Sequence, residues 1–146
     1  MLKNFIESLI SLIKFTRFDD GKKEFIFYSE SKFYRNFYID LILNLKKKNQ
    51  TNIILITSDK DDLIFFKDIV ECLYIKNYYI LLYFFKTLSC KFMIMTLTDL
   101  GNHIQKSKLC KYYVYYFHAI GSTHQMYTNL ASVSYTHLRA HETRGN

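Results

Sequence analysis

The sequence predicts an α/β protein: a Rossmann-like parallel sheet with flanking helices. Three observations support this fold class. Short apolar segments without polar interruption recur along the chain, as in strands that are buried on both faces. Helical patterns lie between several of these segments, which is the alternation expected of βαβ units. Hydroxyl or acidic residues follow the apolar segments, where the carboxyl ends of parallel strands would meet at one edge of the sheet.

The first expected element is an amphipathic helix over residues 1–18. Apolar residues occupy one broad side of this helix, while Lys3, Glu7 and Lys14 lie toward the other. Two interpretations stay open: contact with a membrane surface, or packing against this domain or a further one. We favour packing, because only Lys3, Lys14 and Arg17 would meet anionic lipid.

Five strands and three more helices are expected after it. The strands are residues 24–28, 53–56, 73–75, 92–95 and 112–117, and the helices are residues 32–48, 63–70 and 78–88. In the first of these helices Phe37, Leu41 and Leu45 form the expected apolar spine, and the lysines at its end complement the helix dipole. The strand at 112–117 is bulky on both alternating faces, so we expect it in the interior of the sheet.

The composition limits the class of protein. The chain has 146 residues, 49% of them hydrophobic, which suffices for one domain with a real core. Its formal net charge of +7 is compatible with anionic partners or with a solvated lysine surface. The lysine run at 46–48 is better explained by its place at a helix end than by nucleic acid, so no nucleic-acid partner is expected. No apolar run reaches the roughly 18 residues needed to span a bilayer.

The three cysteines, Cys72, Cys90 and Cys110, are odd in number and lack a C-x-x-C spacing. This argues against a disulfide framework and against a zinc site, and favours buried, inert thiols in a reducing cytoplasm. No carboxylate pair or Cys/His cluster has catalytic spacing. Neither G-x-G-x-x-G nor a P-loop sequence is present, so the sequence predicts no metal and no cofactor.

The end of the chain differs from the rest. Up to Ala131 lysine is the main basic residue, whereas residues 132–146 contain arginine and no lysine. Residues 133–143, V-S-Y-T-H-L-R-A-H-E-T, resemble the translation of a transposon-type sequencing adapter. We therefore treat 132–146 as an artefactual, disordered tail. This leaves residues 19–131 as a truncated Rossmann-like domain behind the N-terminal helix.

Candidate site residues come directly after the predicted strands. The first and the last strand are followed by Ser29, Glu30, His118, Ser122, Thr123 and His124. Ligands of open α/β sheets bind at the carboxyl ends of the strands, so these side chains could line a binding site there. Ordinary loop capping is the alternative explanation for each hydroxyl taken singly.

Three segments have a more specific sequence. They read F-Y-S-E-S-K-F-Y-R-N-F at residues 27–37, M-T-L-T-D-L-G-N-H at 95–103 and Y-Y-F-H-A-I-G-S-T-H-Q-M-Y at 115–127. In this order and spacing they resemble the N-terminal half of the CDP-glycerol glycerophosphotransferase family. The resemblance covers about residues 25–131, and the third segment is its most specific part.

The resemblance implies one half of a GT-B architecture, in which two Rossmann-like domains face a cleft. Family members transfer glycerol phosphate from CDP-glycerol to an acceptor, as in teichoic-acid-like polymers, at the inner face of the membrane. By resemblance, His118 matches the histidine proposed as catalytic base, and histidine suits this task because it titrates near neutral pH. His124 is the second choice, and Ser122 and Thr123 would contact phosphate or acceptor. Ala119 departs from the serine that many members have.

The implied protein is cytoplasmic and peripheral at the inner face of the plasma membrane. Its partners would be CDP-glycerol and a polyol-phosphate or glycan acceptor. This chain alone is expected to be inactive, because the second domain of the family supplies the nucleotide site. The alternative is a non-catalytic module for peripheral membrane or nucleotide-sugar-type binding, which needs no second half.

Overall fold

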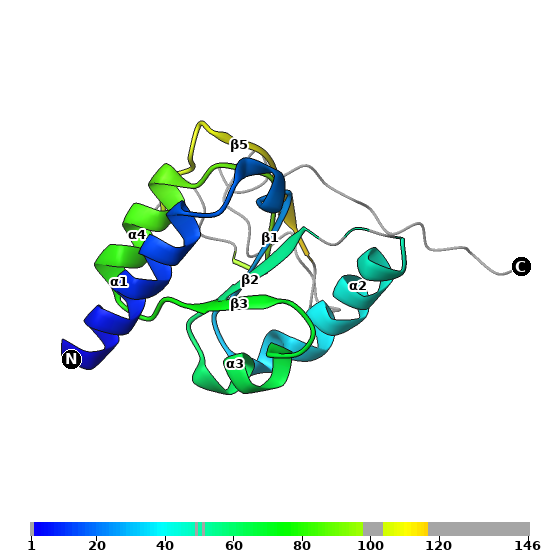
Figure 1. Ribbon diagram of the computed structural model, residues 1–146, viewed down its shortest axis with the longest axis horizontal. Coiled ribbons are helices and arrows are strands. Elements are labelled where there is room, and N and C mark those ends of the chain that lie inside the picture. Colours follow the sequence, from blue (N-terminus) through cyan, green and yellow to red (C-terminus); the bar gives the residue numbers. More distant parts are fainter. Residues whose placement is uncertain (1, 49, 51, 98–103, 117–146) are drawn as a thin grey trace, which may run out of the picture.

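The computed structural model describes residues 2–48, 50, 52–97 and 104–116 of the chain. In these residues a parallel sheet lies between two groups of helices (Figure 1). The elements follow in the order α1 (Leu2–Thr16), η1 (Asp20–Lys22), β1 (Phe25–Ser29), η2 (Lys32–Tyr34), α2 (Arg35–Lys47), β2 (Ile53–Thr57), α3 (Lys60–Phe66), β3 (Glu71–Tyr74), α4 (Tyr78–Thr87), β4 (Cys90–Met95) and β5 (Cys110–Tyr115).

The sheet has five strands in the order β3-β2-β1-β4-β5, and all of its pairs are parallel. From β1 the chain first builds outward through β2 to β3, and then returns to place β4 on the other side of β1. Ile26 in the middle of β1 is therefore the register partner of both Ile54 and Met93. The reversal of strand order between β1 and β4 is the place where open α/β sheets bind ligands. The predicted α/β fold class with a Rossmann-like parallel sheet is confirmed.

The two faces of the sheet carry separate cores. Successive side chains of a strand point to opposite faces, so Ile26 and Tyr28 lie on the side of α1 and α4, whereas Phe27 lies on the side of α2 and α3. On the first side Phe15 of α1 meets Phe84 of α4 edge to face, with ring centroids 5.0 Å apart. On the second, Phe27 meets Tyr38 of α2 at 5.6 Å. Both faces of β1 are thus buried, which explains its unbroken apolar sequence.

The prediction that residues 112–117 form an interior strand is wrong within the described residues, where β5 is an edge strand. Tyr113 and Tyr115 are buried against the core on one face, but Tyr112 is 38% exposed. Its ring stacks on Phe92 of β4, with centroids 5.2 Å apart. Aromatic side chains can cover an edge by lying on their neighbours, so a bulky sequence did not require a strand on both sides.

The apolar spine expected for the second helix is also displaced. Tyr38 and Ile42 are fully buried, whereas Phe37 is exposed. The 3-10 turn η2 comes first and α2 begins only at Arg35. Leu41 and Leu45 are partly buried and pack against the core as expected, but Tyr38 and Ile42 occupy the most buried positions in place of Phe37.

The N-terminal helix α1 buries only a narrow strip of three residues against the domain: Ser8, Leu12 and Phe15. Ser8 is fully buried, and its hydroxyl donates to the Asn4 carbonyl at 2.6 Å and accepts from the N–H groups of Lys76 and Asn77, each at 3.0 Å. Leu12 and Phe15 are the only apolar residues of α1 that are buried. The remaining large apolar residues of the helix are exposed: Leu2, Phe5, Ile6, Leu9, Ile10 and Ile13.

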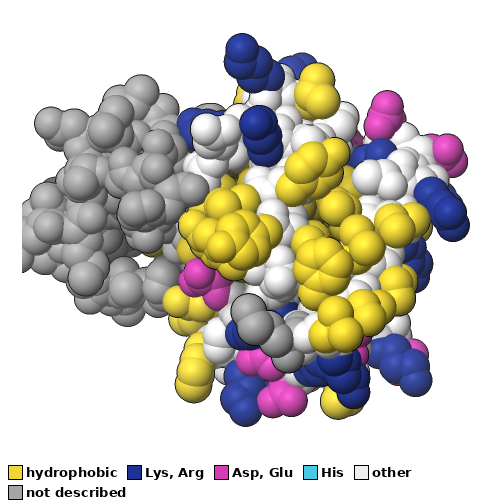
Figure 2. All heavy atoms as spheres, turned by 90° about the vertical axis from the view of Figure 1, so that its left-hand side faces the viewer, with side chains coloured by type: hydrophobic (Ala, Val, Ile, Leu, Met, Phe, Trp, Pro, Cys, Tyr) yellow, Lys and Arg dark blue, Asp and Glu magenta, His cyan; other side chains and the backbone are white. Residues whose placement is uncertain are grey.

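The outward side of α1 continues onto α4. Figure 2 looks onto the side of the molecule where α1 and α4 lie, and hydrophobic side chains spread across it with Lys and Arg around them. Tyr78, Tyr79 and Tyr83 of α4 are exposed there as well. We call this surface the α1–α4 face: the six exposed apolar residues of α1 together with these three tyrosines.

Among the described residues, no helix combines the length and the apolar character that crossing a bilayer requires. The tail at 132–146 lies outside the described residues.

Candidate functional site

The carboxyl ends of the strands bring four hydroxyl groups to one edge of the sheet. Ser29 ends β1, Thr57 ends β2 and is followed by Ser58, and Thr96 follows β4. Because the strands are parallel, these residues lie along the same edge, and all four are buried. The sequence correctly indicated a row of hydroxyl residues at this edge, and the structure assigns each of them a partner inside the protein.

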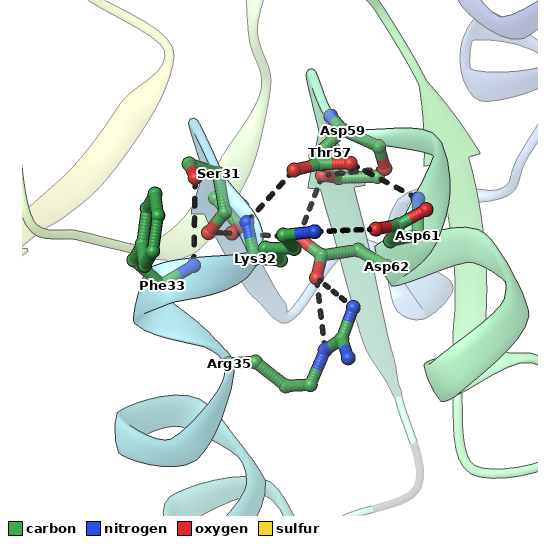
Figure 3. Close-up of polar contacts among 9 residues, drawn as sticks. Ser31, Lys32, Phe33, Arg35, Thr57, Asp59, Asp61 and Asp62 are labelled. Carbon is green, nitrogen blue, oxygen red and sulfur yellow. Dashed lines mark hydrogen bonds and ion pairs between the residues drawn. The ribbon is translucent and has the colours of Figure 1, made fainter.

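The centre of this edge is Asp62, a carboxylate with no exposed surface (Figure 3). Ser29 and Thr57 each donate a hydroxyl to Oδ2 at 2.9 Å. Arg35 donates from Nε and Nη2 to Oδ1, both at 3.2 Å. A buried charge is tolerated only when it is paired and hydrogen-bonded. The four donors meet that requirement and connect β1, β2, α2 and α3 through one side chain. We call Ser29, Arg35, Thr57 and Asp62 the Asp62 network.

The start of α3 explains why Asp62 points inward. Asp59 is the N-cap residue, and its Oδ1 accepts the N–H of Asp61 at 3.0 Å. Its other oxygen accepts the N–H of Lys32 at 3.0 Å. This bond is the main reason why the pKa of Asp59 lies below its ordinary value. With the helix start fixed in this way, Asp62 falls on the inner side of the first turn.

Two cations lie at this edge: Arg35, which belongs to the network, and Lys32, which lies outside it. Arg35 lies with its guanidinium carbon 4.4 Å from the ring centroid of Phe65, so the ring covers one face of the cation. Lys32 pairs with Asp61 at 3.0 Å, and this hydrogen bond raises the pKa of the lysine. Lys32 is exposed, so the second pair is a surface interaction and contributes little to stability.

Two buried tyrosines complete the edge near the β1–β4 reversal. Tyr38 donates its hydroxyl to the carbonyl of Tyr28 at 2.7 Å. The hydroxyl of Tyr28 lies 3.0 Å from that of Ser58, which in turn donates to the Ile75 carbonyl at 2.7 Å. Burial raises the pKa of both Tyr28 and Tyr38, so both phenols stay protonated near neutral pH. They act as fixed hydrogen-bond donors and not as proton carriers.

The geometry limits the chemistry of the described part of the edge. Asp62 has all its acceptor positions occupied by protein donors, so it is a positioning residue and not a general base. The described residues contain no group of three or more metal-binding side chains. Within the described residues the network therefore fixes the geometry of this edge, and its polar groups are engaged with one another.

The structure describes two of the six predicted site residues, Ser29 and Glu30. Ser29 is buried, and its hydroxyl is engaged with Asp62. Glu30 is exposed directly after it. The other predicted residues lie outside the described residues: His118, Ser122, Thr123 and His124. Roles in substrate binding and catalysis stay predictions for all six.

Sequence reasoning missed Asp62 and Arg35. A signal for Asp62 was present, because Asp59 and Asp62 stand at the N-cap and third helical positions after a strand that ends in threonine. Acidic residues at these positions are also typical of exposed helix starts, so the spacing alone did not distinguish a buried carboxylate. Arg35 carried no local signal, since its partner is distant along the chain.

No protein-family model matches the chain, and neither the curated proteins nor the solved structures contain a significant match.

Proposed function

We propose that this chain forms one domain of a group-transfer enzyme with two Rossmann-like domains. Within that class, we propose the acceptor-side half of a GT-B-type glycerophosphotransferase, which moves glycerol phosphate from CDP-glycerol to a teichoic-acid-like or surface-glycan acceptor. The proposal rests on the resemblance of three segments, and the sheet order supplies the observation that supports it best.

Each of the three segments that carry the resemblance includes the carboxyl end of a strand, and the three strands are neighbours. They start at residue 27 in β1, at Met95 at the end of β4, and at Tyr115 at the end of β5. These strands are adjacent in the order β1-β4-β5. Segments far apart in the sequence thus leave the sheet side by side, next to the strand-order reversal where such sheets bind ligands.

The proposed chemistry is attack by an acceptor hydroxyl on the β-phosphate of the donor. His118 would take the proton of that hydroxyl, the new P–O bond would form, and CMP would leave with the electrons of the broken bond. Glu30, Ser122, Thr123 and His124 would contact the substrates. Because Ser29 is held by Asp62, we expect it to act by fixing the start of the segment at 30–37.

The test uses a protein that contains this domain together with a second Rossmann-like domain. His118→Ala should lower turnover with CDP-glycerol by about 10²- to 10⁴-fold, the usual contribution of general-base catalysis. His124→Ala is the matched control and should cause a smaller loss. Turnover of His118→Ala within about threefold of wild type, with donor saturating and chemistry rate-limiting, would remove the base assignment.

We also propose that the α1–α4 face contacts an anionic lipid surface, which would make the protein peripheral at the inner face of the plasma membrane. Six apolar side chains of one helix are exposed, and only Ser8, Leu12 and Phe15 of that helix are buried. Lys3 and Arg17 stand near the two ends of the helix, where they could meet lipid phosphates. Exposed tyrosines on α4 suit the interfacial zone, because each has an apolar ring and a polar tip.

Vesicle sedimentation tests this contact. Wild-type protein should bind vesicles containing anionic phospholipid, and Ile10→Asp on the α1–α4 face should release it. Ile64→Asp on α3 is the matched control: Ile10 is 60% and Ile64 is 78% exposed, but only Ile10 belongs to the face. Equal binding by both variants, or a concentration-dependent dimer that Ile10→Asp dissolves, would replace lipid by another partner.

A non-catalytic binding module is the second candidate. The exposed α1–α4 face is compatible with it. The source DNA distinguishes the two: a second Rossmann-like domain encoded downstream in the same frame supports the transferase, and a stop codon directly after Ala131 supports the module.

A further inference from the structure

Two cysteines that the sequence left unconnected lie side by side in the sheet. Cys90 begins β4 and Cys110 begins β5, and the two residues are direct register partners. Their sulfur atoms are 3.3 Å apart, and both thiols are free and buried. They lie at the amino edge of the sheet, opposite the carboxyl edge that carries the proposed function.

The backbone can accommodate a covalent bond between them. Neighbouring strands are about 4.8 Å apart, and disulfides form across Cα separations of about 4.4 to 6.8 Å. The sulfurs must approach by only about 1.3 Å to reach the normal bond length of about 2.05 Å. Because Cys110 belongs to an edge strand of the described sheet, β5 can make this adjustment without displacing a further described strand.

One member of the pair, Cys90, lines a pocket of about 380 Å³. The charged residues that line this pocket are Asp20, Lys23, Glu24, Lys91 and Lys111. Lys23 and Lys91 are paired with the two carboxylates. Cys90 donates its S–H toward Cys110, and this bond lowers the pKa of Cys110 while it raises that of Cys90. The pair therefore loses its first proton more readily than an isolated buried thiol, and the thiolate is the reactive form.

We propose that Cys90 and Cys110 form an oxidation site, which hydroperoxides convert to an intramolecular disulfide. One thiolate of the pair attacks an oxygen of the hydroperoxide, the O–O bond breaks, and a sulfenic acid and water or an alcohol are formed. The second thiol attacks the sulfenic sulfur, the S–S bond forms, and water leaves with its proton. The two thiols lose two electrons and two protons, and the hydroperoxide is reduced by the same two electrons.

Cys72 provides an internal reference. It lies on β3, away from the other two cysteines, and it is half-buried. Burial, together with the nearby Asp62 and Glu71, raises its pKa to about 12. Cys72 should therefore remain a thiol under conditions that oxidise the pair, although it is less buried than Cys90 or Cys110.

The experiment is titration of the folded chain with hydrogen peroxide, followed by thiol counting and peptide mapping under non-reducing conditions. We expect two of the three thiols to disappear together, a peptide cross-linked between Cys90 and Cys110, and full reversal by dithiothreitol. The melting temperature should rise on oxidation, because the bond closes a loop and restricts the unfolded chain.

Serine substitutions at each of the three cysteines show which thiols form the cross-link. Cys72→Ser should leave the reaction unchanged, whereas Cys90→Ser and Cys110→Ser should each abolish the cross-link, with circular dichroism showing that they fold. Oxidation of all three thiols at one rate, a cross-link that includes Cys72, or over-oxidation of Cys90 or Cys110 without a bond would overturn the proposal. None of these results depends on transferase activity or lipid binding.

Discussion

Asp62 shows how much one side chain can depend on its surroundings. The carboxylate is completely removed from water and receives two hydroxyl donors and two guanidinium donors. The free energy of such a pair is close to balanced as long as both partners are present, because the attraction must offset the loss of hydration. Removing one partner leaves the other without compensation.

We therefore expect Asp62→Ala to lower the free energy of unfolding by about 3 to 5 kcal/mol, the range measured for breaking buried ion pairs. Asp61→Ala is the matched control, because Asp61 is adjacent, exposed and paired only with Lys32 at the surface; its loss should be below about 1 kcal/mol. Urea unfolding of both variants measures the difference. Equal losses of unfolding free energy in the two variants would contradict the conclusion that the Asp62 network stabilises the fold.

The hydroxyl residues at the carboxyl edge could be predicted from the sequence, but Asp62, the hydrogen-bond partner of two of them, could not. Hydroxyl residues after the apolar segments correctly predicted which side chains collect at the carboxyl edge, because parallel strands leave no other arrangement. The partner of those hydroxyls could not be predicted, since it depends on how the first turn of α3 is rotated. That rotation is set by the bonds of Asp59 to Asp61 and to Lys32, and Lys32 belongs to a different βα connection.

At the scale of elements, α1 buries less of its apolar side than amphipathic helices usually do. A helix at the surface of a domain normally packs its apolar stripe inward. Here Leu12 and Phe15 are the only buried apolar residues, and polar contacts also hold the helix: Ser8 binds the start of α4, and Glu7 and Lys14 pair with Lys60 and Glu71 at 2.7 and 2.6 Å. The sequence predicted the helix correctly, but the direction of its apolar side could not be inferred from periodicity alone.

Ser8→Ala tests this attachment. The substitution leaves the N–H groups of Lys76 and Asn77 without their acceptor, which should cost about 1 to 3 kcal/mol of unfolding free energy. Ser11→Ala is the control, because the Ser11 hydroxyl makes no hydrogen bond within the described residues; it should change stability by less than about 0.5 kcal/mol. Thermal unfolding gives the comparison, and limited proteolysis reports whether α1 detaches. A neutral Ser8→Ala would mean that Leu12 and Phe15 alone hold the helix.

For the strands, the local sequence pattern predicted where each strand lies along the chain but not its position in the sheet. Apolar segments located all five strands of the described residues, but only β1 and β2 are free of charged residues. The strands β3, β4 and β5 contain Glu71, Lys91 and Lys111. The position of a strand in the sheet was harder to predict. The side chains of β5 are as bulky as those of an interior strand, yet β5 lies at an edge of the described sheet. Its aromatic residues achieve burial by stacking on β4, which a sequence read strand by strand does not reveal.

For the whole molecule, the composition makes a prediction about the end of the chain. Residues 132–146 change from lysine to arginine usage and resemble translated adapter DNA. Deleting them should therefore alter the free energy of unfolding by less than about 1 kcal/mol, the size of an ordinary damaging substitution. The amide spectrum of residues 25–97 should also stay unchanged. A larger loss of stability would mean that the segment packs against the domain.

The strand order has a consequence for how the chain is made. β1, β2 and β3 are consecutive, and each pairs with the next, so this part of the sheet can assemble once residue 74 has left the ribosome. The other edge of β1 must wait for β4, and until then an apolar strand edge in the nascent chain is open to chaperones or to neighbouring chains. Pulse-labelled hydrogen exchange during refolding should detect protection of Leu55 before that of Ile94; simultaneous protection would indicate a sheet that forms all at once.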